Sequence, residues 1–307
     1  MTTPADTVPL RHSPVSETFC DRERQNVNIS KILIDAIHYI KKFEGDIFVI
    51  KFTGDIMREE KVMETIAQDL VLLHRMGVKP VVVHGGRLEI SDYMEKVGMK
   101  PKMVNGLRVT DEATMDVVNM VLGKLGGEVV GCINKYGARS VCINGTDANL
   151  FVADKRKSEI DLGRVGDIKK INKEIVLDLI NAKYIPVISS VAVDDNGKTL
   201  NVNADTVAGE LAAALGASKL IVLTNVAGVL DENGKLIKRL TVSEIDELIN
   251  SKKVIGGMIP KLSSCKIALE KGVKRAHVVK ASEHGILGEV LTSYGAGTMV
   301  TLEKIRE

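Results

Sequence analysis

Two lysines and one aspartate from distant parts of the chain could act together on one anion. Lys51 follows the apolar run 47–50, and Asp205 stands just before the apolar run 206–215, where a helix dipole favours a carboxylate. Lys261 lies far downstream, in a Gly-Gly-Met-Ile-Pro-Lys sequence. Phosphoryl transfer requires mainly positioning and cationic stabilisation of the migrating group. We therefore expect both ammonium groups to face one phosphate, with the Asp205 carboxylate holding them in place.

Glycine-rich loops at the ends of apolar runs predict the surroundings of that phosphate. His84-Gly85-Gly86 ends the run 81–83, and Gly256-Gly257 precedes Lys261. Glycine lets backbone N–H groups approach an anion, and a helix N-terminus adds a favourable dipole. Each piece alone also fits a plainer role, since a lysine at a strand end is commonly a solvated charge and Gly-Gly is commonly a turn. The chain has no Walker A, zinc-pair, nucleophile-elbow or dinucleotide-binding pattern.

Alternating strand and helix patterns predict how these residues are positioned. Continuous apolar runs are typical of strands buried on both faces of a parallel sheet, and ligands of such sheets bind at the carboxyl ends of the strands. The segment 151–169 is polar and predicts a hairpin or excursion, and no linker separates the two halves, so we expect one continuous sheet. The expected strands are 47–50, 80–83, 140–143, 185–188, 219–223 and 277–279. The expected helices are 58–76, 88–97, 115–122, 206–215, 243–248 and 262–270.

Composition restricts the class of protein. The 307 residues carry a net charge of +2, which argues against a dedicated nucleic-acid or membrane surface. No apolar run approaches the roughly 20 residues of a membrane span, and the N-terminus has no signal core, so we expect a cytoplasmic protein. The four cysteines are scattered without metal-ligand spacing, which favours thiols in a reducing compartment. They are Cys20, Cys132, Cys142 and Cys265.

The N-terminal region divides into two expected parts. Residues 1–28 are polar and contain three prolines, which predicts a disordered tail. Residues 29–44 repeat apolar side chains at helical spacing, which predicts an amphipathic helix before the first strand. Its apolar face could pack on its own domain or on another subunit.

Taken in order, these stretches resemble the amino acid kinase family from about residue 29 to the C-terminus. The resemblance implies an α/β fold, a three-layer α/β/α sandwich with a mostly parallel central sheet. It implies an acyl amino acid-binding lobe at 45–195 and an ATP-binding lobe at 196–307. The reaction implied is transfer of the γ-phosphate of ATP to the side-chain carboxylate of N-acetylglutamate. The matching stretches are 49–51, 84–86, 105–111, 161–166, 201–205, 223–229, 256–261 and 295–299.

The resemblance also implies a role for each matching residue. Lys51 and Lys261 stabilise the transition state, and Asp205 organises them. Mg²⁺ is held by the phosphates and has no protein ligand. Arg108 suits its role because a guanidinium can grip a carboxylate through two parallel hydrogen bonds. The substrate side comprises Gly85, Gly86, Arg108 and Asn201. The ATP side comprises Gly54, Thr224, Asn225, Gly257 and Met258.

The expected helix 29–44 resembles that of arginine-sensitive family members, in which such helices interlace dimers into a hexamer and arginine binds beside them. A homo-oligomer, either a dimer or a hexamer, and inhibition by arginine are therefore expected. The positions that match the effector site are Tyr39, His277, Glu289 and Gly295.

Several positions depart from the family pattern around the predicted active site. Thr53 and Arg87 replace glycines, and Asp55 adds a negative charge near the phosphates. Three functions stay open: a kinase for N-acetylglutamate, a kinase for a related acyl amino acid, and a catalytically impaired regulatory relative that binds arginine or acylglutamate. The other departures are Leu88-Glu89, Thr146 and Lys280-Ala281-Ser282.

Overall fold

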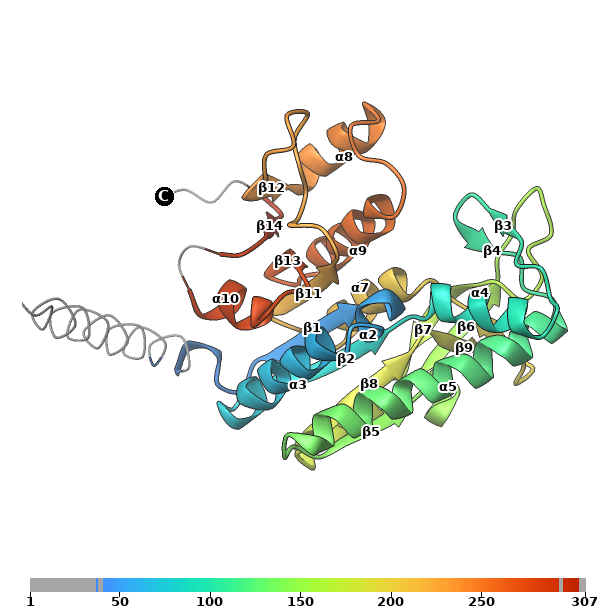
Figure 1. The fold of residues 1–307 in the computed structure, drawn as a ribbon, viewed down its shortest axis with the longest axis horizontal. Coiled ribbons are helices and arrows are strands. Elements are labelled where there is room, and N and C mark those ends of the chain that lie inside the picture. The colour runs from blue at the N-terminus through green and yellow to red at the C-terminus, as the bar shows by residue number, and fades with distance from the viewer. Residues whose placement is uncertain (1–36, 38–40, 293–294, 304–307) are drawn as a thin grey trace, which may run out of the picture.

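The computed structural model describes residues 37, 41–292 and 295–303, and an eight-stranded sheet runs through them (Figure 1). All its neighbouring pairs are parallel except β13 with β14, which confirms one continuous, mostly parallel sheet. In spatial order the strands are β12 (Arg239–Thr241), β14 (Thr298–Thr301), β13 (Arg275–Lys280), β11 (Lys219–Thr224), β1 (Ile47–Phe52), β2 (Lys79–His84), β8 (Ile185–Ser189) and β5 (Ser140–Ile143).

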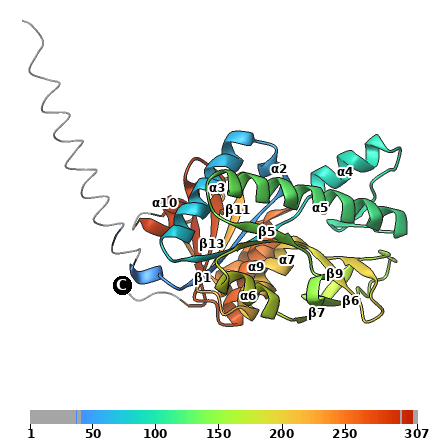
Figure 2. The ribbon, with the colours of Figure 1, turned by 90° about the horizontal axis from the view of Figure 1, so that it is seen from below.

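Helices cover both faces of this sheet, which confirms the three-layer sandwich (Figure 2). One face carries α3 (Glu60–Arg75), α5 (Glu112–Lys135) and α10 (Gly285–Leu291). The other carries α6 (Glu174–Asn181), α7 (Ala204–Ala214) and α9 (Met258–Glu270), and α8 (Val242–Asn250) packs on α9. Two short helices, α2 (Gly54–Met57) and α4 (Arg87–Lys96), follow β1 and β2.

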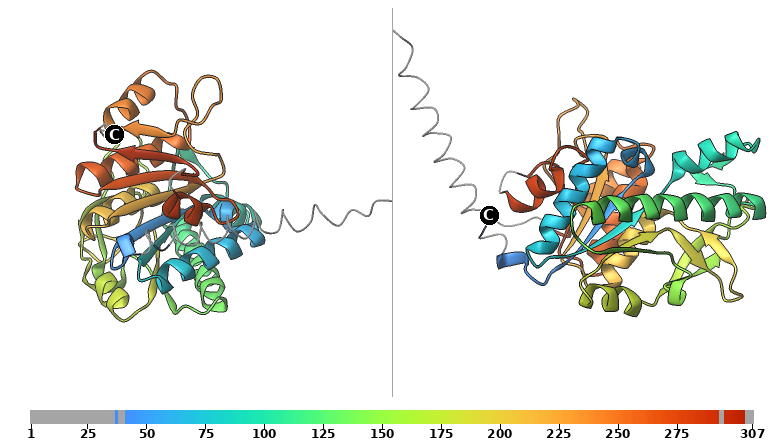
Figure 3. Two further views of the ribbon diagram at one scale, coloured as in Figure 1. Left: turned by 90° about the vertical axis from the view of Figure 1, so that its left-hand side faces the viewer. Right: turned by 60° about the horizontal axis from the view of Figure 1, so that its bottom comes forward.

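Side chains of β1 explain why both faces are covered. Val49 is buried in the core beneath α7 and α9, while its neighbours Phe48 and Ile50 are buried in the core beneath α3. Successive strand side chains point to opposite faces, so an uninterrupted apolar run needs a helix layer on each. Each fully buried side chain of this size contributes about 1.5–3 kcal/mol. The strands from residues 219–301 form one half of the main sheet, and those from residues 47–189 form the other half (Figure 3).

A second sheet of four strands extends beyond the main one. It has the order β10 (Thr199–Asn201), β9 (Val191–Val193), β6 (Phe151–Lys155) and β7 (Gly166–Ile171). The antiparallel pair β6–β7 confirms the hairpin expected in 151–169. The proposed lobe boundary at 195/196 falls in the turn between β9 and β10, which pair with each other. A two-stranded ribbon, β3 (Met103–Val104) and β4 (Leu107–Arg108), lies nearby.

Helix α5 is longer than the expected helix 115–122. It begins after Asp111, whose side chain accepts a hydrogen bond from the Thr114 backbone N–H at 2.8 Å, and it continues through several glycines. Glycine disfavours a helix, which is why the apolar pattern predicted an earlier end. At Gly126 the reason for glycine is contact, because a methyl group there would lie 2.3 Å from Cys142 Sγ.

Most of the N-terminal region lies outside the described residues, including the expected tail 1–28 and Tyr39. The chain is helical at 41–43, and the ring of Phe43 packs edge-on against Phe48 at 5.3 Å between centroids. Within the described ranges, no helix combines the length and apolar character needed to span a membrane.

Candidate active site

Lys51 and Asp205 meet in a buried ion pair. Lys51 Nζ lies 2.6 Å from Asp205 Oδ1, and the two side chains are 2% and 10% exposed. The contact is one of charge, because Oδ1 has no partner in hydrogen-bond geometry among the described residues. Asp205 stands in the first turn of α7, where the Asn203 side chain caps the helix by accepting from Asp205 N and Thr206 N. The segment 201–205 is therefore both a helix cap and part of the site.

Lys261 approaches the same place from α9. Its Nζ donates to Gly257 O at 3.1 Å, one turn earlier in the helix, and no ion pair joins it to Asp205 in the described part of the chain. Burial lowers the pKa of Lys261, Asp205 opposes that shift, and Lys51 adds to it. Asp205 thus contacts one of the two expected ammonium groups and influences the other electrostatically.

The two glycine loops after β1 and β2 lie beside this pair. A methyl group on Gly85 would lie 3.2 Å from Ala204 Cβ, so the loop after β2 closes on the start of α7. Thr53 has φ −96° and ψ 159°, and Arg87 opens α4, so both departures occupy conformations that any residue adopts. The backbone at these two positions therefore does not require glycine.

One residue here was not assigned a role from the sequence. The Glu89 carboxylate lies against Gly54, where a methyl group would be 1.8 Å from Oε2. Its other oxygen, Oε1, accepts from Arg58 Nε at 2.7 Å. The replacement Leu88-Glu89 beside the glycine loop was the only signal for it in the sequence.

Arg108 is buried, and the part of the chain that the structure describes gives it no negative partner. It is 6% exposed, and Nη2 donates to Arg87 O at 2.8 Å and to Ser91 Oγ at 2.7 Å. Its pKa is lowered by burial and by the nearby Arg87, and no carboxylate pairs with it among the described residues. A buried guanidinium with only neutral acceptors is unfavourable alone and favours an anionic ligand.

Asn201 belongs to the same network through Thr110. Asn201 Nδ2 donates to Thr110 Oγ1 at 3.2 Å, and that hydroxyl donates to Arg108 O at 2.8 Å. The strand β10 and the segment after β4 are thereby fixed to each other. Thr110 thus links the Asn201 side chain to the backbone of Arg108.

Four of the residues expected to bind ATP lie at the end of β11 or at the start of α9. Thr224 ends the strand, and the next residue, Asn225, donates from Nδ2 to Asp55 Oδ2 at 3.0 Å. Gly257 is the N-cap of α9, and Met258 is the first residue of that helix. Asp55 therefore contacts a residue on the expected nucleotide side.

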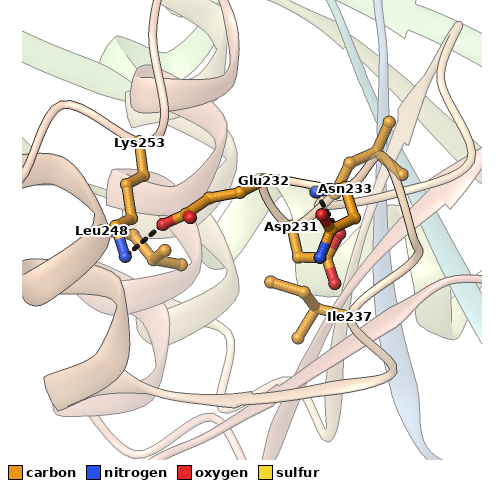
Figure 4. A pocket seen from close by; sticks show the side chains of 7 residues that line it. Asp231, Glu232, Asn233, Ile237, Leu248 and Lys253 are labelled. Atoms are coloured by element: carbon orange, nitrogen blue, oxygen red, sulfur yellow. Dashed lines mark hydrogen bonds and ion pairs between the residues drawn. The ribbon is translucent and has the colours of Figure 1, made fainter.

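A hollow of about 180 Å³ lies further along the same edge and was not predicted (Figure 4). Its rim carries the ion pair of Lys253 with Glu232, at 2.5 Å. The hollow is bordered by a hairpin whose two sides are bridged at Leu230 and Leu236. The polar turn 231–234 between these apolar residues was the signal in the sequence for that hairpin. The lining residues are Leu230, Asp231, Glu232, Asn233, Ile237, Leu248 and Lys253.

Nothing in the described chain forms a cluster of three or more His, Cys, Asp or Glu side chains suited to a metal ion. The cationic side chains around the glycine loops suit a polyphosphate instead. A divalent cation that arrives with phosphates fits this arrangement, since Mg²⁺ usually binds through phosphates and few carboxylates.

Three of the four residues expected to bind an effector, His277, Glu289 and Gly295, lie together in a separate cluster, and Tyr39 lies outside the described residues. His277 Nδ1 lies 2.6 Å from Glu289 Oε1, and a methyl group on Gly295 would lie 3.3 Å from Glu289 Oε2. Lys219 was not predicted: its Nζ is 3.2 Å from His277 Nε2 and 5.0 Å from the centre of the Phe43 ring. Burial, with repulsion from Arg275, lowers the pKa of Lys219 to about 8. The signal in the sequence that could have pointed to Lys219 was a lysine at the start of an otherwise apolar strand.

Comparison with known proteins gives one family. Residues 46–280 match the model of the amino acid kinase family. The acetylglutamate kinase of Petrotoga mobilis is 45% identical over 282 residues, which cover 90% of this chain and 94% of that one. The acetylglutamate kinase of Methanocaldococcus jannaschii is 45% identical over 287 residues, covering 89% and 96%.

Solved structures share the fold at lower identity. The N-acetylglutamate synthase of Neisseria gonorrhoeae, complexed with coenzyme A and N-acetyl-glutamate, has a TM-score of 0.81 at 24% identity. That match covers 90% of this chain and 64% of the synthase chain. Carbamate kinase from Giardia lamblia bound to AMP-PNP has a TM-score of 0.59 at 14% identity. These likenesses concern the fold alone.

Proposed function

Since the chain belongs to the amino acid kinase family, we propose that Lys51, Asp205 and Lys261 catalyse phosphoryl transfer from ATP to the side-chain carboxylate of N-acetyl-L-glutamate. The protein is a phosphotransferase with a carboxyl acceptor, and its reaction belongs to arginine biosynthesis. The buried Lys51–Asp205 pair at 2.6 Å, with Lys261 in its electrostatic reach, is the observation that carries the proposal.

The two ammonium groups act on the charge of the migrating group. ATP supplies the phosphoryl group, and Mg²⁺ held by its phosphates neutralises part of their charge. Lys51 is fixed by Asp205, so its ammonium needs no reorganisation during the reaction. Among the residues that the structure describes, Lys261 donates only to a backbone carbonyl at the start of its own helix, so its ammonium is available to a phosphate oxygen.

Arg108 and Asn201 hold the acceptor substrate. The Arg108 guanidinium exchanges its neutral acceptors for the α-carboxylate, which supplies the missing negative charge. Asn201 holds the amide end, and the backbone N–H groups of Gly85 and Gly86 bind near the acceptor carboxylate. The buried course of this loop beside α7 supports that assignment.

The nucleotide lies on the side of β11 and α9. The proposed contacts are to Gly54 near the phosphates and to the helix N-terminus at Gly257 and Met258, where the dipole favours phosphate. Thr224 and Asn225 border the same edge. The lobe 196–307 therefore binds ATP, and the lobe 45–195 binds the acyl amino acid.

Three finer proposals complete the assignment. We place the enzyme in the cytoplasm, as a dimer or as a hexamer in which the segment 29–44 joins dimers to one another. We also propose that arginine inhibits it at His277, Glu289 and Gly295, with Tyr39 contributing. A mixture of acid and base in a buried cluster supports recognition of an amino acid there.

A coupled assay of ADP release tests the catalytic proposal. N-acetylglutamate should support turnover, whereas N-acetylglutamine, which has no side-chain carboxylate, should not. Faster turnover with another N-acetyl amino acid would move the assignment to a related acyl amino acid kinase. Binding of ATP and N-acetylglutamate without any ADP release would leave only the regulatory function.

Arginine is tested in the same assay together with light scattering. Inhibition that is lost in His277→Ala would support the effector site. Unchanged activity and unchanged particle mass at saturating arginine would contradict it.

A further inference from the structure

The Glu89 carboxylate lies between the loops that follow β1 and β2. A methyl group on Gly54 would be 1.8 Å from Glu89 Oε2, and one on Gly86 would be 3.9 Å from the same atom. Oε2 is buried and has no hydrogen-bond partner in the part of the chain that the structure describes. An anionic oxygen therefore already stands beside the two loops whose glycines are proposed to meet the nucleotide and the acceptor.

Arg58 holds this carboxylate from the surface. Arg58 Nε is 2.7 Å from Glu89 Oε1, and Arg58 Nη2 is 2.6 Å from Asp92 Oδ2. The Glu89 side chain is 14% exposed and that of Arg58 is 43% exposed, so the pair runs from the buried loops to solvent. Glu89 also stands in the first turn of α4, where the helix dipole favours a negative charge.

Two anionic groups cannot share this position. A carboxylate and a phosphate at contact distance repel each other, and a buried carboxylate oxygen without a donor is unfavourable where it stands. Glu89 must therefore leave when a phosphate arrives at the glycine loops. Arg58 stands at the exposed end of this pair and keeps its second partner, Asp92, when Glu89 leaves.

We propose that Glu89 occupies the position of the nucleotide's terminal phosphate in the ligand-free protein, held there by Arg58, and that the nucleotide must displace it. This inference rests on the proposed nucleotide site. It makes Glu89 a built-in competitor of the γ-phosphate and not a ligand of the bound nucleotide. Glu89 should therefore weaken the binding only of nucleotides that carry a third phosphate.

Binding of two nucleotides to the full-length protein tests this by calorimetry. Glu89→Gln keeps the size of the side chain and removes its charge, so it should bind Mg·AMP-PNP about three- to tenfold more tightly than the wild type. Mg·ADP, which lacks the terminal phosphate, should bind both proteins equally. Glu95→Gln, an exposed neutralisation on the same helix, should leave both affinities unchanged.

Arg58→Met supplies a second, independent variant. This variant keeps the charge of Glu89 and removes the guanidinium that holds it in place. It should therefore also increase the affinity for Mg·AMP-PNP more than that for Mg·ADP. Equal affinities of Glu89→Gln and wild type, weaker binding by Glu89→Gln, or equal tightening of both nucleotides would each overturn the inference. If wild type and Glu89→Gln both fail to bind either nucleotide, the nucleotide site itself is wrong and both proposals fall.

Discussion

Lys51 and Asp205 illustrate how a buried charge pair can serve a reaction. Removing two charges from water is unfavourable, and their attraction offsets this only when the geometry is good. Here the pair is closed at 2.6 Å and almost fully buried, at the junction of β1 and α7. A fixed ammonium beside a phosphate is useful for catalysis because it does not reorganise. We infer that the pair is retained for this use.

Asp205→Asn should destabilise the protein, because it leaves the Lys51 ammonium buried without a negative partner. We expect a loss of about 3–5 kcal/mol in the free energy of unfolding, measured by urea titration. The double variant Lys51→Met with Asp205→Asn should recover part of this loss. A single variant as stable as the wild type would show that water reaches the ammonium.

Lys261→Ala should lower kcat much more than it weakens binding of ATP or N-acetylglutamate. The Lys261 contact strengthens as charge develops in the transition state, so we expect a fall of about 10²–10³-fold in kcat. Steady-state kinetics and nucleotide binding measure the two effects separately. Lys266→Ala, on the same helix and paired with Asp246 at 2.6 Å, is the matched control. Equal losses in kcat and in binding would contradict the catalytic role.

At the scale of the elements, the sequence predicted the strands that are buried on both faces and the loops that follow them. It did not predict β12 and β14, which are short, nor α10, which starts at Gly285 after His284 in the left-handed conformation. Their positions depend on long-range pairing, such as Val278 of β13 with Thr298 of β14, which no local pattern encodes. The sequence assigned no role to Glu89 for the same reason, because its contact with Gly54 joins two loops that are distant in the chain.

His84, at the end of β2, should make stability depend on pH. Its imidazole is completely buried, and burial lowers its pKa from 6.5 to about 4. Below pH 6.5 the unfolded chain takes up a proton at this imidazole, whereas the folded chain does not. The stability that the neutral imidazole contributes is therefore complete above pH 6.5 and is lost as the pH falls toward 4. At about 1.4 kcal/mol per pKa unit, we expect a loss of roughly 3 kcal/mol from this residue.

Urea unfolding at a series of pH values measures this loss. His84→Gln should flatten the fall in stability between pH 6.5 and 4, whatever its stability at pH 7. His74→Gln, which changes a partly buried imidazole on α3, should flatten it much less. An identical slope in wild type and His84→Gln would show that the buried imidazole is protonated in the folded state.

At the scale of the whole molecule, the sheet joins the proposed substrate and nucleotide lobes into one body. Strands β1 and β11 are neighbours, so the end of β1 that carries Lys51 and the end of β11 that precedes Asn225 lie at the same edge. The hydrogen bond from Asn225 to Asp55 ties the two loops there. A site at this edge is therefore assembled from both halves of the chain, which explains why no single motif identified it.

Assembly beyond one chain depends on the N-terminal segment in our proposal. Phe43 packs against Phe48 and beneath the Lys219 ammonium, so a truncation that tests assembly should end before Phe43 and leave these contacts intact. Deleting residues 1–41 should then reduce a hexamer to dimers in light scattering, while circular dichroism and the unfolding midpoint stay close to those of the full chain. Deleting only residues 1–28 should leave the mass of the assembly unchanged apart from the missing residues. If the 1–41 deletion keeps the full assembly, the helix expected in 29–44 packs on its own subunit, and the contacts between chains lie elsewhere.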